Sequence, residues 1–118
     1  MSTSPDNDHR IDYIELPARD LDAVRTFYGT VFGWPFEDYG PDYTAFFDGR
    51  LAGGFFRADA AATSGALVVL YATDLEATEQ RVRDAGGTIT EAIFSFPGGR
   101  RFHFADPVGN VLAVWADH

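Results

Sequence analysis

Hydrophobic and polar positions follow two similar series along the chain, each a strand pattern followed by a helix pattern. The first series alternates over residues 11–17, and a helical pattern then covers residues 20–33. The second begins with an apolar run over residues 67–72, and its helical pattern covers residues 74–87. Two-residue alternation favours a strand, and apolar residues three and four positions apart favour a helix. The pattern therefore predicts a strand and a helix in each half of the chain.

The predicted helices have plausible first and last residues. Asp20 and Asp74 precede the apolar stripes and are of the type that caps helix N-termini. Gly33 and Gly86 follow the stripes, where a left-handed conformation often ends a helix. Short strand patterns follow each helix, at residues 35–38, 43–47, 51–56, 88–94, 100–104 and 111–115.

The order of these elements predicts an α+β fold made of two βαβββ modules, residues 10–57 and 66–116, in a single domain. Neither module alone could bury both faces of its sheet, so we expect the two to pack around a shared cavity. The Ala-, Ser- and Thr-rich segment 58–65 is the expected linker, and residues 1–9 are an expected flexible tail.

Composition narrows the functional classes. The 118 residues are 46% hydrophobic, which is enough for a real core, and they include no cysteine. Disulfides, thiolate metal sites and cysteine nucleophiles are thereby excluded, and a cytoplasmic location is expected. We find no signal-peptide pattern and no apolar stretch of membrane-spanning length.

Charge argues against several partners. The formal net charge is −9, and all nine basic residues are arginine. A chain this acidic lacks the clustered positive charge that nucleic acids and anionic membranes require, so we expect neither as a partner. Without lysine, Schiff-base chemistry is excluded.

An ordered set of short motifs resembles the vicinal-oxygen-chelate superfamily of glyoxalases, bleomycin-resistance proteins and extradiol dioxygenases. No single motif is specific, but together they span residues 10–116. The motifs are Ile14-Glu15-Leu16-Pro17 with Asp20-Leu21, Phe27-Tyr28 with Val31-Phe32-Gly33-Trp34, Thr73-Asp74-Leu75, Ala85-Gly86-Gly87 and Asp106-Pro107-Val108-Gly109-Asn110.

The resemblance implies a divalent-metal site, but its ligand positions carry the wrong residues. The first-strand positions fall on Tyr13 and about Val69, and the last-strand positions on Ala113 and near residues 53–55. None of these side chains is a usual ligand for a divalent cation, so we expect no metal and no other cofactor. Metal-free members of the superfamily are similar to ligand-binding proteins, including drug-sequestering proteins of antibiotic resistance, so the resemblance implies a binding protein. Relatives often form dimers, so it also implies a homodimer.

Strand alternation identifies candidate ligand-binding residues. Tyr13 and Glu15 share one face of the first strand, which the resemblance turns toward the cavity. Trp115 and one ring of the Phe55-Phe56 pair, taken as Phe55, are expected to line the same cavity, and Tyr71 is taken as the counterpart of Glu15. Ordinary core is the alternative for the aromatic residues, and a solvated or Arg-paired carboxylate is the alternative for Glu15.

His103 is the one histidine away from the ends of the sequence, so it is a candidate acid, base or ligand-binding group. Alternation alone leaves both faces of its strand open. The segment Asp106 to Asn110 is predicted to be a turn rather than a metal loop. The pair Gly98-Gly99 is predicted to form a hairpin at the cavity mouth.

Three functions remain. The first is metal-free binding of a small aromatic or cationic organic molecule, since aromatic faces and a carboxylate attract cations. The second is a metal-independent isomerase or lyase with Glu15 as general base and Tyr13, Tyr71 or His103 orienting the substrate. A weaker third is an unconventional metal site made by Glu15 and His103.

Overall fold

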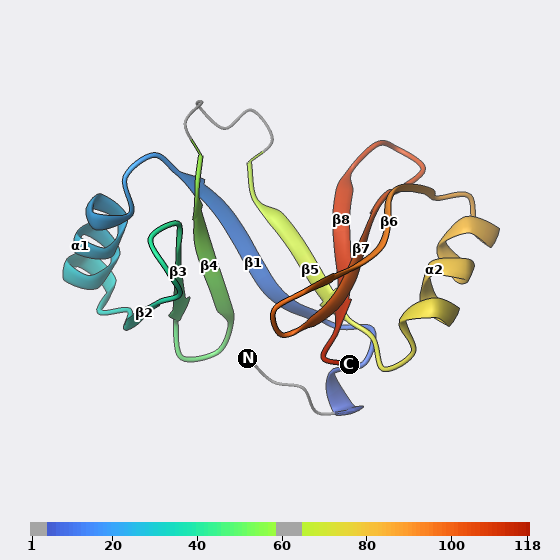
Figure 1. Ribbon diagram of the computed structural model, residues 1–118, viewed down its shortest axis with the longest axis horizontal. Helices are drawn as coiled ribbons and strands as arrows, with labels where there is room; N and C mark the ends of the chain where they lie inside the picture. The colour runs from blue at the N-terminus through green and yellow to red at the C-terminus, as the bar shows by residue number, and fades with distance from the viewer. Residues whose placement is uncertain (1–4, 59–64) are drawn as a thin grey trace. The chain divides into compact units, whose positions relative to one another are not determined.

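The strands and helices follow one another in the predicted order (Figure 1). The computed structural model describes residues 5–58 and 65–118. Two compact units emerge: Tyr13–Leu67 form the first, and the segment up to Asp12 joins Val68–His118 in the second. The predicted linker, residues 58–65, lies almost wholly outside the described residues.

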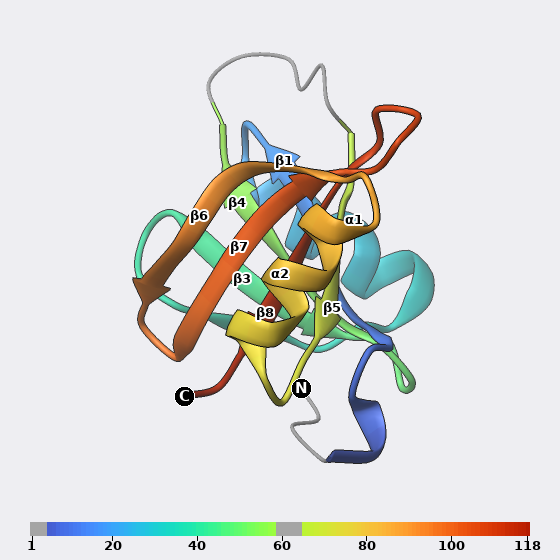
Figure 2. The ribbon, with the colours of Figure 1, turned by 90° about the vertical axis from the view of Figure 1, so that its right-hand side faces the viewer.

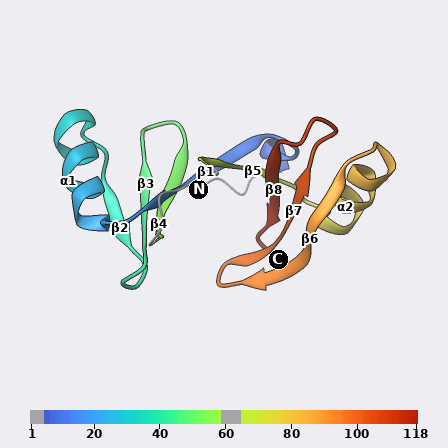
Figure 3. The same ribbon diagram turned by 90° about the horizontal axis from the view of Figure 1, so that it is seen from above.

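The first unit is a four-stranded sheet in the order β2-β3-β4-β1 with one helix. β1 and β4 are parallel, while β2, β3 and β4 are antiparallel neighbours. Figure 3 shows α1 to one side of this sheet. The elements are β1 (Ile11–Ala18), α1 (Leu21–Phe32), β2 (Phe36–Asp38), β3 (Tyr43–Phe47) and β4 (Ala52–Arg57).

Local sequence explains where α1 begins and ends. The Asp20 carboxylate accepts a hydrogen bond from the Ala23 backbone N–H at 3.1 Å, which satisfies a donor at the helix start. Gly33 ends the helix in the left-handed conformation, with φ of 73°. Beneath the helix, Leu16 and Phe55 from the sheet join the core of this unit.

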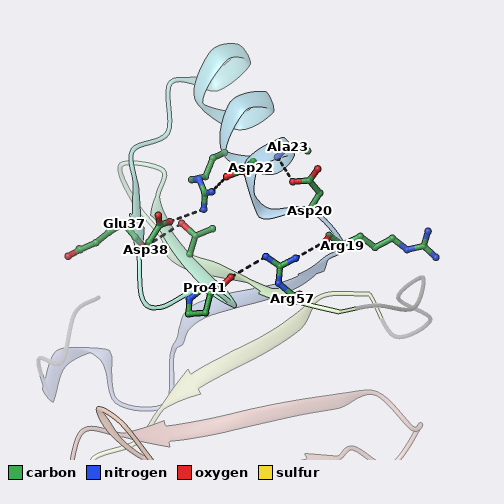
Figure 4. A network of polar contacts seen from close by, with 10 residues as sticks. Arg19, Asp20, Asp22, Ala23, Glu37, Asp38, Pro41 and Arg57 are labelled. Carbon is green, nitrogen blue, oxygen red and sulfur yellow. Dashed lines mark hydrogen bonds and ion pairs between the residues drawn. The ribbon is translucent and has the colours of Figure 1, made fainter.

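Arg57, at the end of β4, ties the loops of the first unit together (Figure 4). Its Nε donates to Asp42 Oδ1 at 3.0 Å, and its two Nη atoms donate to the carbonyl oxygens of Arg19 and Pro41. Planar guanidinium groups suit such multiple contacts. Arg57 therefore links the loop that follows β1, at Arg19, to the loop that precedes β3, at Pro41 and Asp42.

The second unit repeats the plan with the strand order β5-β8-β7-β6. β5 and β8 are parallel, and β8, β7 and β6 are antiparallel neighbours. In Figure 2, α2 lies across this sheet. The elements are β5 (Leu67–Tyr71), α2 (Leu75–Asp84), β6 (Thr88–Phe96), β7 (Gly99–Ala105) and β8 (Val111–Ala116).

Asp74 caps α2 as Asp20 caps α1, because its carboxylate accepts from the Ala77 N–H at 3.0 Å. Leu75, the first helical residue, is buried against Phe102 and Val114 of the sheet. Both modules thus use an Asp-Leu pair to begin the helix and to anchor its first turn in the core.

Residues 5–9 correct the prediction of a flexible tail. Residues Pro5–Asn7 form a short 3-10 helix, η1, and Asp8 forms a parallel bridge with Tyr71. The Asp8 carboxylate also accepts the Thr73 N–H at 2.8 Å. Backbone hydrogen bonds hold this segment against β5. Amino-acid composition could not predict this pairing. Across the described residues, no helix is both long and apolar enough to cross a membrane.

Candidate functional site

In the first unit, β1 divides its side chains between two faces. Leu16 packs in the core under α1, so Glu15 and Tyr13 lie on the opposite face, here called the helix-free face. In the register of the sheet, Glu15 is opposite Gly54, and Gly54 is opposite Ala45. Small residues therefore lie beside Glu15 on the neighbouring strands.

Tyr43 fills the space that these small residues leave. Its hydroxyl is 2.5 Å from the Tyr13 hydroxyl and donates to Glu15 Oε2 at 3.0 Å. The three side chains, all half-buried, form what we call the tyrosine–glutamate cluster. Sequence reasoning identified Tyr13 and Glu15 and missed Tyr43, although its position on β3 and the glycine pair on β4 were available signals.

Gly54 is required by this arrangement. A Cβ atom at residue 54 would lie 2.0 Å from the Tyr43 hydroxyl oxygen and 2.3 Å from the ring carbon that bears it. Gly53 allows a close approach of the Phe46 ring on the other face, where a Cβ atom at residue 53 would lie 2.3 Å from the nearest ring carbon. The two consecutive glycines therefore admit one aromatic ring on each side of β4.

The Tyr43 hydroxyl remains protonated at neutral pH. Burial raises the pKa of Tyr43 well above its ordinary value, and the negative charge of Glu15 raises this pKa further. A protonated hydroxyl beside a carboxylate acts as a hydrogen-bond donor. Tyr43 is therefore a fixed donor to Glu15.

The expectation that Phe55 lines a ligand site is wrong. Phe55 is opposite Leu16 in the register, and its side chain is 3% exposed in the core beneath α1. Its ring contacts those of Tyr28 and Phe46. Phe55 is an ordinary core residue, as the alternative interpretation expected. It follows Gly54 directly on β4, so its side chain lies on the face opposite to the tyrosine–glutamate cluster.

In the second unit, His103 lies on the helix-free face. Its neighbours Phe102 and Phe104 belong to the core cluster that includes Leu75 of α2, so alternation places His103 on the other side. Its Nδ1 is 3.5 Å from the Glu91 carboxylate, and its ring lies 5.7 Å from that of Phe94. The side chain is 14% exposed.

Arg101 lies two residues before His103 on the same face. Its guanidinium carbon is 5.5 Å from the ring centroids of both Phe94 and Phe96, within the range of cation–π attraction. The two phenylalanines thus hold a cation against the sheet. Strand alternation places Arg101 on the same face as His103, but the sequence alone left open which way that face is turned.

Tyr71 and Trp115 are buried and hydrogen-bonded in this unit. The Tyr71 hydroxyl donates to Asp117 Oδ1 at 2.8 Å, and the Trp115 indole N–H donates to Asp12 Oδ2 at 2.9 Å. Burial, and then the Asp117 carboxylate, raise the pKa of Tyr71 to about 12. The polar atoms of both rings thus have carboxylate partners within the fold. Asp12, 7% exposed, was missed by the sequence reasoning.

The helix caps correct the proposed equivalence of Tyr71 and Glu15. Glu15 lies five residues before the cap Asp20, and Val69 lies five residues before the cap Asp74. Tyr71 instead corresponds to Pro17. The second module therefore has an apolar residue in the place of the Glu15 carboxylate.

The residues present do not fit the divalent metal that the fold implies. Counted from the same helix caps, Leu67 rather than Val69 corresponds to the ligand position at Tyr13. The side chains of Leu67, Val69 and Ala113 have no atom that could bind a metal. Tyr13 is hydrogen-bonded to Tyr43, and Gly54 has no room for a ligand side chain. Among residues 5–58 and 65–118, no group of three or more His, Cys, Asp or Glu is placed to hold a metal ion.

Two βαβββ modules, each with one helix on one face of its sheet and polar groups on the other, define a glyoxalase-like fold. The sequence profile of the Glyoxalase/Bleomycin resistance protein/Dioxygenase superfamily matches residues 10–114, and the chain belongs to this superfamily. This confirms the resemblance found in the motifs. No curated protein matches the sequence.

Solved structures share the fold at low sequence identity. A superfamily member from Vibrio splendidus 12B01 is 20% identical with a TM-score of 0.74, over 92% of this chain and 98% of that one. A methylmalonyl-CoA epimerase from Mycobacterium tuberculosis is 14% identical with a TM-score of 0.71, over 92% and 87%. A Mn(II)-bound glyoxalase from Novosphingobium aromaticivorans is 23% identical with a TM-score of 0.70, over 94% of this chain but 40% of that one.

Proposed function

We propose that this protein binds a small organic ligand without a metal, on the helix-free face that carries the tyrosine–glutamate cluster. The observation that carries the proposal is the Tyr43 hydroxyl, which joins Tyr13 and Glu15 at 2.5 and 3.0 Å. A few fixed polar groups beside aromatic side chains are typical of small-molecule sites.

The expected ligand is aromatic or cationic. Glu15 supplies a carboxylate, and the rings of Tyr13 and Tyr43 lie beside it. Aromatic faces attract cations, and a carboxylate adds opposite charge. The net charge of −9 also attracts cations over a longer range.

A metal-independent isomerase or lyase is the alternative. The observation in its favour is that Glu15 is held at a fixed position by Tyr43, as a general base must be. Such an enzyme would convert its ligand, whereas a binding protein returns it unchanged.

The test is ligand-observed NMR with a mixed library of aromatic cations, aromatic anions and neutral aromatic compounds, followed by mass spectrometry of the recovered compounds. We expect cationic members to bind, to be recovered unchanged, and to bind more weakly to Glu15→Gln. Recovery of a converted compound would replace binding with the enzymatic alternative, and Glu15→Gln should then abolish conversion while sparing binding. Binding of no compound would overturn the proposal.

A further inference from the structure

The solvent side of α1 carries uncharged and apolar residues, where a surface helix normally carries polar and charged ones. Leu21, Val24 and Tyr28 pack in the core of the first unit. The exposed residues on the solvent side, here called the outer face of α1, are Ala23, Thr26, Phe27, Thr30 and Val31. All five are uncharged, and Phe27 and Val31 are 54% and 55% exposed.

The second module shows that the fold itself does not require an apolar outer face. Counted from the N-cap of each helix, the α2 residues that correspond to Thr26, Phe27 and Thr30 are Gln80, Arg81 and Asp84. All three α2 residues are exposed, and two of them are charged. The core position of Tyr28, in contrast, is apolar in both helices. Exposed apolar surface that the fold does not need is typical of an interaction site.

Charge limits what can cover the outer face. Arg25, the one basic residue of α1, forms ion pairs with Asp22 and Asp38, so its charge is balanced within the unit. Helices that bind anionic membranes carry several basic residues on their polar side, and α1 does not. A second copy of the chain has the same net charge of −9, so two copies meet most favourably through an uncharged face.

The outer face is also complementary in shape to a second copy of itself. Residues four positions apart form rows along a helix, and neighbouring rows leave a groove between them. The large Phe27 side chain belongs to one row, and the small Thr26 and Thr30 side chains form the next row. Across a twofold axis, the Phe27 ring of each copy can lie in the groove beside the threonines of the other.

We propose that the outer face of α1 is a self-association surface, through which two copies of this chain form a reversible twofold dimer. Phe27 and Phe32, 54% and 59% exposed with ring centroids 6.4 Å apart, form the apolar centre. They present roughly 200 Å² of ring surface in each copy, since one phenylalanine can bury about 150–250 Å². A contact centred on one helix buries less than the roughly 1,200–2,000 Å² of a stable interface, so the dimer depends on concentration. This proposal is independent of the proposed ligand binding.

The experiment is sedimentation velocity of the full chain at concentrations from about 5 to 500 µM, where a dimer with Kd on the order of 100 µM dissociates on dilution. Thr26→Arg should weaken the dimer by about tenfold or more, because it buries an unpaired charge in the contact. The net charge falls only from −9 to −8 in this variant, since one positive charge is added. General repulsion between copies therefore decreases, and a weaker dimer would report on the outer face alone.

Phe27→Ala should also weaken the dimer by about tenfold or more, because one anchor is lost from each copy. Phe47→Ala is the matched control. Phe47 lies in the same unit and is 46% exposed, but its neighbour Phe46 packs in the core beneath α1, so Phe47 lies on the helix-free face. We expect this control to leave Kd unchanged. Thr26 is exposed, so Thr26→Arg keeps the test valid if Phe27→Ala loses stability.

Crosslinking locates the contact directly. The chain has no cysteine, so one introduced cysteine marks one position. Bismaleimidoethane, which links two thiols over a short distance, should join Thr26→Cys into dimers about tenfold faster than Gln80→Cys, because the dimer raises the local thiol concentration. Gln80 is the corresponding exposed residue of α2.

Three outcomes would overturn the proposal. The first is a wild-type chain that stays monomeric at every concentration. The second is a dimer that survives both Thr26→Arg and Phe27→Ala, or that is crosslinked equally from the two helices, because the contact would then lie elsewhere. The third is a monomeric chain that floats with vesicles of phosphatidylcholine and phosphatidylglycerol and loses this binding in Phe27→Ala, because a membrane would then cover the outer face.

Discussion

At the scale of single residues, Tyr43 and Gly54 depend on each other, because the ring of one occupies the space that a side chain on the other would need. The hydroxyl of Tyr43 reaches Glu15 and Tyr13 by crossing β4 above Gly54. The cluster therefore depends on a residue that contributes no functional group.

Gly54→Ala tests this dependence. The new methyl group would lie 2.0 Å from the Tyr43 hydroxyl oxygen, so the ring must move, and we expect a loss of about 1–3 kcal/mol in the free energy of unfolding. Urea unfolding followed by circular dichroism measures this change. In a Tyr43→Ala background the same substitution should cost clearly less, because the space is then available.

Gly29→Ala is the control for the glycine substitution. Its added methyl group would meet only the Trp34 carbonyl oxygen at 3.8 Å, an ordinary contact, and it lies in the middle of α1. Alanine favours a helix more than glycine does, so stability should stay the same or rise. An equal loss for the two variants would contradict the packing argument.

Strand alternation predicted part of the candidate site. It placed Tyr13 and Glu15 on one face correctly, because that relation depends only on the two-residue period. Tyr43 was missed because its hydroxyl reaches β1 across an intervening strand, which requires the register of three strands. Phe55 was assigned to the wrong face because the choice between Phe55 and Phe56 depends on the same register.

At the scale of elements, the predicted helices and strands agree with the structure to within two residues, except that α2 ends at Asp84, three residues before the end of the predicted helical pattern. The helix starts could be predicted because Asp20 and Asp74 act locally on the first turn of each helix. Residues 5–9 could not, because their order comes from a bridge to Tyr71, far away in sequence. Local sequence therefore predicts where the helices and strands lie, whereas the order of residues 5–9 depends on pairing with a segment far away in sequence.

Corresponding turns after β3 and β7 are each organised by an aspartate. Asp48 accepts the backbone N–H groups of Arg50 and Leu51, and Asp106 accepts those of Val108 and Asn110. Asp106 also accepts a hydrogen bond from the Asn110 side chain at 2.9 Å. These bonds confirm that residues 106–110 form a turn.

From these two aspartates we predict that the stability of the turns falls at acidic pH. The Asn110 side chain, and then backbone N–H groups, lower the pKa of Asp106, and backbone N–H groups lower the pKa of Asp48. A pKa lowered by folding stabilises the fold above the ordinary carboxyl pKa, and this contribution is lost as pH falls through the lowered value. Carboxyl carbon NMR should show both groups titrating below the ordinary aspartate value.

Asn110→Ala separates the effect of the Asn110 side chain on the pKa of Asp106 from the effect of the backbone N–H groups. It removes the largest contribution to the shift at Asp106, so the pKa of Asp106 should rise toward the ordinary value while that of Asp48 stays the same. An unchanged titration of Asp106 in this variant would mean that the side-chain bond from Asn110 has no effect on the carboxylate.

At the scale of the whole molecule, the chain has the fold of a superfamily named for enzymes and resistance proteins, but not the fold's metal ligands. We predict that protein incubated with nickel, zinc, manganese or iron and then desalted will retain far less than one metal ion per chain. Inductively coupled plasma mass spectrometry of tag-free protein measures this content.

Metal retained at one equivalent per chain would contradict the assignment of ligand positions. Glu15→Gln and His103→Ala would then be measured separately to show whether either side chain holds the ion. Low metal content in the presence of aromatic ligand binding would agree with the proposed function.

The fit between Tyr43 and Gly54 has a consequence for how this sequence can diverge. A side chain at position 54 costs stability as long as position 43 carries a tyrosine. Mutation at position 54 is therefore favoured after position 43 has changed to a smaller residue, and the two positions should change together among descendants of this chain. A substitution that placed a carboxylate at position 54 would cost less stability after loss of the tyrosine.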